Sequence, residues 1–136
     1  MQPVEDKQVF PRSEHLKSSL AIKEVMDANQ SVYSYPIKCY YDLPEQSGRV
    51  SVQLAVTVPK KRFHHAVDRN RLKRLMREGY RLEKHQLLVP EGKCCRLCWI
   101  FVAKEMASFA EVREAASSVF QKINLALETQ RNEKTV

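Results

Sequence analysis

The sequence of 136 residues has no apolar stretch close to the ~20 residues that a membrane-spanning helix needs. Its first residues include Glu5 and Asp6 and form no apolar segment of the kind that directs export. Internal repeats and low-complexity stretches are also absent. We therefore expect a soluble, cytoplasmic protein with one folded domain over 1–136 and poorly ordered ends at 1–13 and 128–136.

A metal site is also missing from the sequence pattern. Reduced, buried thiols are expected in a chain without an export signal, and the four cysteines are Cys39, Cys94, Cys95 and Cys98. The spacing Cys95-x-x-Cys98 is typical of zinc ligands. However, the segment is predicted to be a strand, in which residues three apart face opposite ways. The four histidines lack ligand spacing, so we expect no metal and no cofactor bound by the side chains alone.

Acidic residues are scattered, and none of them form the cluster that a metal-dependent nuclease needs. His64 and His65 are the candidates for a general acid and base, but adjacent side chains project apart and both lie in a basic loop. Phosphate contacts or plain surface exposure explain these two histidines better. We therefore predict no catalytic residue in this chain.

Positive charge is concentrated in one segment. Between Lys60 and Lys84 there are ten Lys or Arg and three acidic residues, a net charge of +7. The rest of the chain holds 13 basic and 13 acidic residues, so this segment carries the whole imbalance of the protein. Such local charge is typical of a surface that binds a polyanion.

Hydrophobic periodicity predicts six elements in the order α-β-β-α-β-α. The helices are expected from Ser18 or Ser19 to Asn29, at 69–87 with Asp68 as N-cap, and at 108–127; the strands are expected at 35–42, 49–58 and 94–103. Two of the helices have one apolar face each, and the sheet has a strongly apolar face. This pattern predicts an α+β fold, a two-layer α/β sandwich.

The strand at 49–58 has the clearest alternation in the sequence. One face is valine and leucine, and the other is small and nearly uncharged, which leaves room for a ligand to lie on it. Pro59 ends the strand because it has no amide hydrogen for the ladder. A basic loop then follows at 60–66.

The helix after this loop separates apolar from basic residues. At ~100° per residue, Leu72, Leu75, Met76, Gly79 and Leu82 share one arc. The opposite arc holds Arg69, Asn70, Lys73, Arg74, Arg77, Arg81 and Lys84.

A solvated helix face would explain such a stripe, but the first turns are crowded with cations, which the helix dipole disfavours. An incoming phosphate would gain both the cations and the free amide hydrogens. Arg can also form bidentate phosphate contacts and stack on bases, and Asn70 can bond a base edge or a 2′-hydroxyl. We predict an RNA-binding surface made of Lys60, Lys61, Arg62, His64, His65, Arg69, Asn70, Arg71, Lys73, Arg74, Arg77 and Arg81.

The stretch 60–78 resembles the signature of bacterial ribonuclease P protein subunits. The pattern Ala-Val-x-Arg-Asn-x-x-Lys-Arg-x-x-Arg-Glu is matched by Ala66, Val67, Arg69, Asn70, Lys73, Arg74, Arg77 and Glu78. In element order the resemblance extends over about 16–125, but residue by residue it is close only over 59–82. It departs in the loop at 63–65, which is one residue longer than usual and lacks the family's glycine.

The resemblance implies a ribosomal-protein-like fold with an unusual left-handed β-α-β crossover. It implies a protein that joins a catalytic RNA and helps it to remove the 5′ leader of precursor tRNA. The chemistry would belong to the RNA and its Mg²⁺ ions, and the two partners would be the ribonuclease P RNA and precursor tRNA. Neither a membrane nor an obligate protein partner is expected.

A leader cleft between the first helix and the sheet is also implied by the resemblance. It would be lined by Ile22, Met26, Lys38, Tyr40, Ser51 and Gln53. Ile22 and Met26 stand where the family often has Phe, so ordinary core packing is the alternative for both. For Tyr40 the alternative is an exposed aromatic without a ligand. A non-catalytic ribosomal-type RNA-binding protein remains the alternative function, although it would lack the Arg-Asn-x-x-Lys-Arg spacing.

Overall fold

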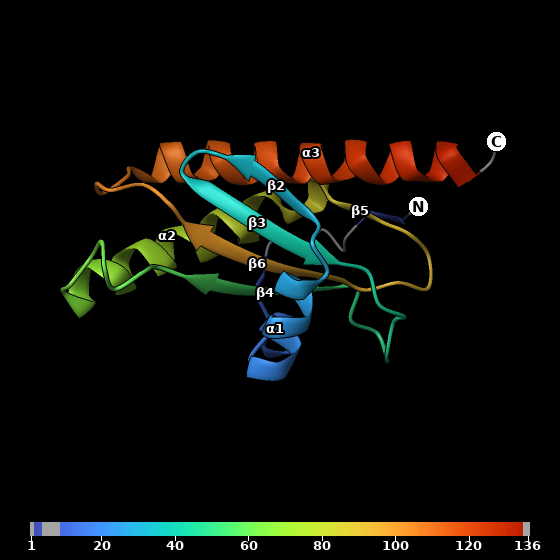
Figure 1. Ribbon diagram of the computed structural model, residues 1–136, viewed down its shortest axis with the longest axis horizontal. Helices are drawn as coiled ribbons and strands as arrows, with labels where there is room; N and C mark the ends of the chain where they lie inside the picture. The colour runs from blue at the N-terminus through green and yellow to red at the C-terminus, as the bar shows by residue number, and fades with distance from the viewer. Residues whose placement is uncertain (1, 4–8, 135–136) are drawn as a thin grey trace.

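The computed structural model describes residues 2–3 and 9–134, with side chains over 9–130. Three helices and a four-stranded sheet make up most of it (Figure 1). The helices are α1 (Ser19–Asp27), α2 (Ala66–Glu83) and α3 (Phe109–Lys134). The strands of the sheet are β2 (Ser31–Ser34), β3 (Ile37–Asp42), β4 (Val52–Thr57) and β6 (Cys95–Phe101). The remaining elements are β1 (Gln2–Pro3), η1 (Arg12–Glu14), η2 (Lys84–Gln86) and β5 (Leu88–Val89).

The sheet has the strand order β2-β3-β6-β4. Neighbouring strands are antiparallel except for β4 and β6, which run parallel and are joined through α2. The predicted α+β class is confirmed. The left-handed sense of the β4–α2–β6 crossover stays a prediction. None of the helices in the described part of the chain is long and apolar enough to cross a membrane.

Strand alternation divides the sheet into two faces. One face packs against α2 and α3, and its core includes the fully buried side chains of Tyr80, Trp99, Phe101 and Phe120. The other face is partly covered by α1, which lies against β3 and β6 (Figure 1). A smaller cluster of Leu16, Val25 and Cys98 holds α1 there, with Ala21, Ile22, Tyr40 and Ala55 packed around it.

Both ends of helix α1 have the capping residues that the sequence predicts. The Ser18 side chain accepts a hydrogen bond from the Ala21 amide at 3.3 Å, and Asn29 has a φ of 58° just after the helix. In contrast, α2 begins at Ala66 rather than Arg69, and its N-cap is His65 without a side-chain cap. The predicted Asp68 cap is therefore wrong, and that carboxylate lies in the first turn.

Three further features differ from the sequence prediction. The short strand β2 was not expected, nor was the two-stranded sheet of β1 and β5. Helix α3 continues to Lys134 through residues that the sequence suggested were a poorly ordered tail. Residues 1 and 4–8 of the predicted N-terminal tail, and residues 135–136, lie outside the described residues.

Candidate nucleic-acid interface

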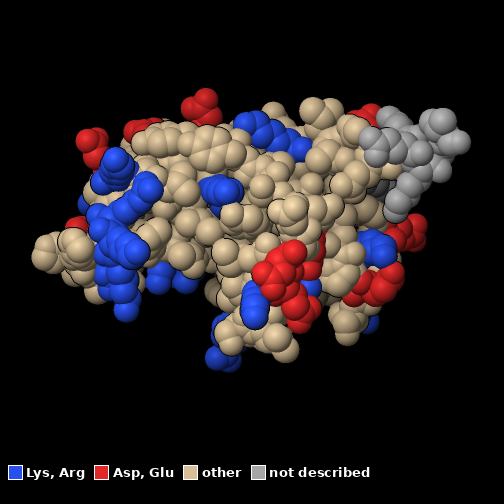
Figure 2. Space-filling model, viewed as in Figure 1, with Lys and Arg blue, Asp and Glu red and all other residues tan. Residues whose placement is uncertain are grey.

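The exposed side of α2 is a positively charged surface. Asn70, Arg71, Arg74 and Arg77 are all exposed, and none has a side-chain hydrogen bond or ion pair with another described residue. Figure 2 shows Lys and Arg gathered at the end of the molecule where α2 begins (compare Figure 1). Unpaired cations on one helix face are the arrangement that counterion release favours in nucleic-acid binding.

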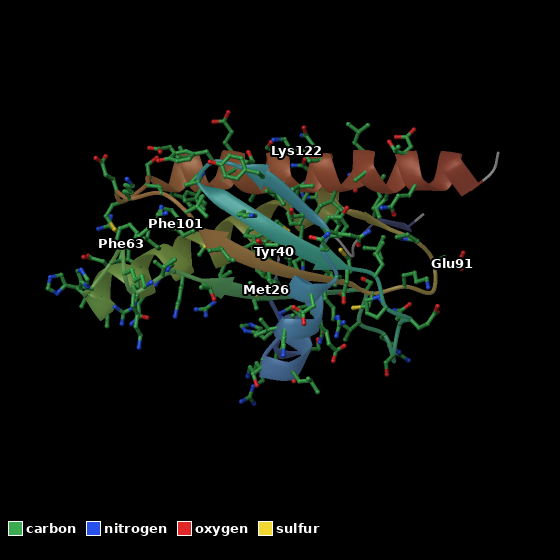
Figure 3. All side chains as sticks on the ribbon, in the orientation of Figure 1. Met26, Tyr40, Phe63, Glu91, Phe101 and Lys122 are labelled. Atoms are coloured by element: carbon green, nitrogen blue, oxygen red, sulfur yellow. The ribbon has the colours of Figure 1, made fainter. Side chains whose placement is uncertain are left out.

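The loop at 60–65 is fixed to the body of the protein. Arg69 Nη1 donates to the carbonyl oxygens of Phe63 at 2.8 Å and of His64 at 2.9 Å. The Phe63 ring is buried against Phe101, with 5.6 Å between the ring centroids (Figure 3). The guanidinium of Arg62 donates to the Val102 carbonyl at the end of β6. Two predicted RNA-binding arginines therefore also hold the loop in place.

The other predicted RNA-binding residues lie on the same side of the molecule. Lys60, Lys61, His64 and His65 are exposed in the loop before α2, and Lys73 is half-buried. Arg81 is paired with Glu78, with 2.8 Å between Nε and Oε2. This hydrogen bond lowers the pKa of Glu78 and raises that of Arg81, so the pair stays charged. The interface is therefore most positive toward the first turns of α2.

Lys84 lies outside the basic stripe on which the helical wheel placed it. It is buried, and its Nζ contacts Glu14 Oε1 at 2.9 Å and Oε2 at 3.0 Å and also donates to the Val9 carbonyl. The Tyr80 hydroxyl donates to the same carboxylate. The sequence prediction is wrong here because the buried arc of α2 is turned toward Tyr80, away from Leu75 and Leu82, which are half-buried.

Part of the predicted leader cleft is brought together on the α1 side of the sheet. Tyr40 and Ile22 both pack on the cluster around Val25 and Cys98. Lys38 Nζ lies 5.0 Å from the centroid of the Tyr40 ring, so the cation faces the aromatic surface. Met26 is 40% exposed at the end of α1 (Figure 3). Ile22 is thus half-buried in the small cluster, whereas Met26 faces outward.

Ser51 and Gln53 lie at the other end of this face. The Gln53 amide donates to the Ser13 carbonyl at 3.2 Å, and Ser51 precedes β4 beside η1. In the sheet, Gln53 is in register with Arg96, whose other neighbour is Asp42. Gln53 is therefore one register row from Tyr40 and two from Lys38, and lies two strands away from both, on β4 rather than β3.

Arg96 joins α1 to the sheet at this end. Its Nε contacts Asp42 Oδ1 at 2.8 Å, and its Nη2 lies 3.4 Å from Glu24 Oε2 on α1. These hydrogen bonds raise the pKa of Arg96, which stays fully charged. Because the cation is already paired with two carboxylates, it is not available to bind a phosphate as the free arginines of α2 are.

Sequence analysis missed two side chains on the α1 side of the sheet. Tyr33 of β2 is 51% exposed, and Ile100 of β6 is in the same cross-strand row. Thr57 of β4 completes this row and lies on the small, uncharged face that the alternation at 49–58 predicts. Strand alternation would also have placed Ile100 on this face, whereas Tyr33 could not be placed because no sequence pattern indicates that β2 is a strand.

The cysteines are buried thiols on two faces of the sheet. Cys95 belongs to the large core, whereas Cys98 lies under α1, so the two residues face opposite ways. Burial raises the pKa of Cys94 and of Cys98 to about 11. Within residues 2–3 and 9–134, no group of three or more His, Cys, Asp or Glu side chains is arranged to hold a metal ion.

Comparison with known proteins identifies the family. A family model described as Ribonuclease P matches residues 10–124. A ribonuclease P protein component from Porphyromonas gingivalis is 35% identical over 107 residues, which are 76% of this chain and 78% of the relative. The corresponding protein from Chlorobium phaeobacteroides is 34% identical over 130 residues, which are 85% of this chain and 88% of the relative.

Solved structures agree with this result at the level of the fold. The RNase P protein from Thermotoga maritima has a TM-score of 0.65 at 21% identity, covering 80% of this chain and 96% of that chain. The RNase P protein from Staphylococcus aureus has a TM-score of 0.62 at 20% identity, covering 81% and 94%. The chain belongs to the ribonuclease P protein component family, whose members bind RNA and take part in tRNA 5′ processing.

Proposed function

We propose that this chain binds the ribonuclease P RNA through the exposed side of α2 and the loop at 60–65, and binds the 5′ leader of precursor tRNA on the sheet beside α1. The observation that carries the proposal is the unpaired basic surface of α2. Asn70, Arg71, Arg74 and Arg77 are exposed there without partners among the described side chains. Such a surface gains most from a polyanion, because no internal ion pair has to be broken first.

The leader site is supported by Lys38 and Tyr40. A cation 5.0 Å from an aromatic centroid, beside a half-buried Ile22, offers one phosphate contact and one stacking surface. Contacts of this kind tolerate many sequences, because every base has a face that can stack. That tolerance suits a protein whose substrates differ in their leaders.

Phosphodiester hydrolysis would be carried out by the RNA subunit and its Mg²⁺ ions, and this chain would position the RNAs. Its own acidic residues do not form a site that could hold such ions, within the part of the chain that the structure describes. Of the histidines in the loop, neither His64 nor His65 has a side-chain partner that would fix it as an acid or base. The role of the protein is therefore electrostatic and geometric.

Reconstitution tests the proposal. The purified protein is combined with a bacterial ribonuclease P RNA, and 5′ cleavage of precursor tRNA is measured at low Mg²⁺ with and without the protein. We expect the wild-type protein to enhance cleavage and the variant Arg74→Ala to enhance it less. Lys93→Ala is the matched control, because it removes one positive charge before β6, where Lys93 pairs with Glu45.

Protein that leaves cleavage unchanged with a matched RNA would refute the proposal. Equal losses for Arg74→Ala and Lys93→Ala would show that only the total charge matters. Cleavage by the protein in the absence of RNA, surviving rigorous purification, would contradict the assignment of the chemistry to the RNA.

A further inference from the structure

One row of side chains on the α1 side of the sheet is left uncovered by α1. The register pairs Tyr33 with Lys38, Lys38 with Ile100 and Ile100 with Thr57, so these four residues cross the sheet as a line, here named the Tyr33 row. The cluster that holds α1 includes residues of the adjacent row, Tyr40, Cys98 and Ala55, and none from the Tyr33 row.

The Tyr33 row offers a second aromatic surface next to Tyr40. Tyr33 lies directly opposite Lys38 and is diagonal to Tyr40, a position at which Cβ atoms are ~7–8 Å apart and long side chains remain within reach. Lys38 is a neighbour of both tyrosines, because it is paired with Tyr33 in the sheet and its Nζ lies 5.0 Å from the centroid of the Tyr40 ring. A cation therefore lies between two tyrosines whose rings are not buried in the core.

Tyr33 is held in place at the edge of the sheet. Its carbonyl accepts a hydrogen bond from Lys122 Nζ on α3, which also brings a second cation to this edge. Figure 3 shows Tyr40 on the sheet and Lys122 on α3. An exposed tyrosine on a fixed backbone, opposite Lys38 on the neighbouring strand, is a surface suited to a stacked base with a phosphate beside it.

The row is also the part of the sheet closest to the basic loop. Thr57 is the last residue of β4, and the loop with Lys60 and Lys61 follows it. The carbonyl that Arg62 binds belongs to Val102, two residues after Ile100. In the other direction, the row beyond Tyr40 contains Asp42 and Arg96, and Arg96 pairs with both Asp42 and Glu24 of α1, so two carboxylates face one cation there. Figure 2 shows acidic residues gathered near α1, away from the basic end.

We propose that Tyr33 is a leader-binding residue, and that the leader runs from Tyr40 across Lys38 to Tyr33 and on toward the loop at 60–65. This inference rests on the proposed function, which places the catalytic RNA beside the first turns of α2. The leader is favoured over a protein partner because the charge along this path is positive and becomes negative only beyond Tyr40. Tyr33 then contacts a nucleotide nearer the cleavage site than Tyr40 does.

The test uses the reconstituted holoenzyme and measures Kd for precursor tRNA with leaders shortened one nucleotide at a time, and for mature tRNA. Tyr33→Ala should weaken binding of the full-length precursor by about tenfold, as expected for one lost stacking contact, and leave mature tRNA unchanged. Tyr33→Phe should bind normally because it keeps the ring. As the leader is shortened, the effect of Tyr40→Ala should disappear before that of Tyr33→Ala.

Leu125→Ala is the control, because Leu125 is 64% exposed on α3, which covers the other face of the sheet. Unchanged precursor affinity in Tyr33→Ala, with a loss in Tyr40→Ala, would overturn the inference and leave the proposed function standing. If the wild-type holoenzyme bound precursor and mature tRNA equally, the leader site of the proposed function would itself fail. Equal losses in Tyr33→Ala and Leu125→Ala would also overturn the inference.

Discussion

Arg69 and Arg74 lie on one helix but have different neighbours. Arg74 is exposed without a partner among the described side chains, whereas Arg69 holds the carbonyls of Phe63 and His64. We predict that Arg74→Ala weakens binding to the ribonuclease P RNA and reduces the log–log salt slope by about one, with an unchanged melting temperature. Arg69→Ala should weaken RNA binding and also destabilise the fold by about 1 kcal/mol.

Salt-dependent binding assays and thermal melts of the free variants provide both measurements. An Arg74→Ala protein with wild-type affinity and slope would show that the exposed side of α2 is only a solvated surface. An Arg69→Ala protein as stable as the wild type would show that its two hydrogen bonds do not hold the loop.

For Lys84 we predict a loss of stability rather than of RNA binding, because its charge forms an ion pair with Glu14 inside the protein. Removing one partner of a buried ion pair leaves the other uncompensated, at a cost of about 3 kcal/mol or more. We expect Lys84→Ala to lower the free energy of unfolding by that order, because the Glu14 carboxylate and the Tyr80 ring lose their cation. Chemical denaturation measures it. The RNA affinity of the folded fraction should be unchanged. A loss of RNA affinity without a loss of stability would show that Lys84 belongs to the RNA-binding surface.

The sequence alone could not show that Lys84 is buried while the arginines of α2 are exposed. Periodicity assigns Lys84 to the polar arc because lysine is normally solvated, and Tyr80 is not counted as apolar. The burial of Lys84 depends on Glu14, a residue 70 positions away that also accepts the hydrogen bond of the Tyr80 hydroxyl. Lys84 and Tyr80 can be buried only because of this long-range contact. A local sequence pattern contains no information about it.

At the scale of elements, α1 is the least firmly attached helix. It has nine residues, too few to be stable alone, and Val25 is its buried residue. We predict that Val25→Ala weakens its docking by about 2 kcal/mol, the loss expected for a buried valine with its cavity. The thiol of Cys98, which lies under α1, should then react faster with an alkylating reagent.

Peptide mapping by mass spectrometry follows this reaction, and Cys95 is the internal control because it faces the large core. Faster labelling of Cys98 alone means local opening of α1. Equal acceleration at both cysteines would mean global unfolding and would contradict the prediction of a separately mobile helix.

Elements with strong periodicity were predictable, and short ones were not. The alternation over 49–58 and the apolar stripe of the last helix correspond to β4 and α3. Strand β2 has four residues, Ser31–Ser34, two of them serine, and it is ordered by pairing with β3 and by Lys122 of α3. For the same reason, sequence analysis placed Tyr40 on the α1 side of the sheet but missed Tyr33. The basic surface was predictable because it lies within one helix and its loop.

At the scale of the whole molecule, burial of thiols predicts how stability depends on pH. The pKa values of Cys94 and Cys98 are raised from 9.0 to about 11 by burial. The folded protein therefore keeps these two protons up to a higher pH than the unfolded chain does. Between these values the folded state binds more protons, and raising the pH therefore favours unfolding. The stabilisation is complete below about pH 9 and is lost as the pH rises toward 11.

Each of these thiols contributes at most about 1.4 kcal/mol per pH unit over that interval. We expect the urea midpoint to be steady from about pH 7 to 8.5 and to fall steeply from about pH 9 to 11. The pKa values of Cys39, Cys95, Tyr41 and Tyr80 are also raised by burial, but these groups remain in the variant Cys98→Ala, which removes one buried thiol. The variant should lose stability less steeply than the wild type. Parallel curves for the two proteins would show that Cys98 keeps an ordinary pKa and that α1 does not shield it from water.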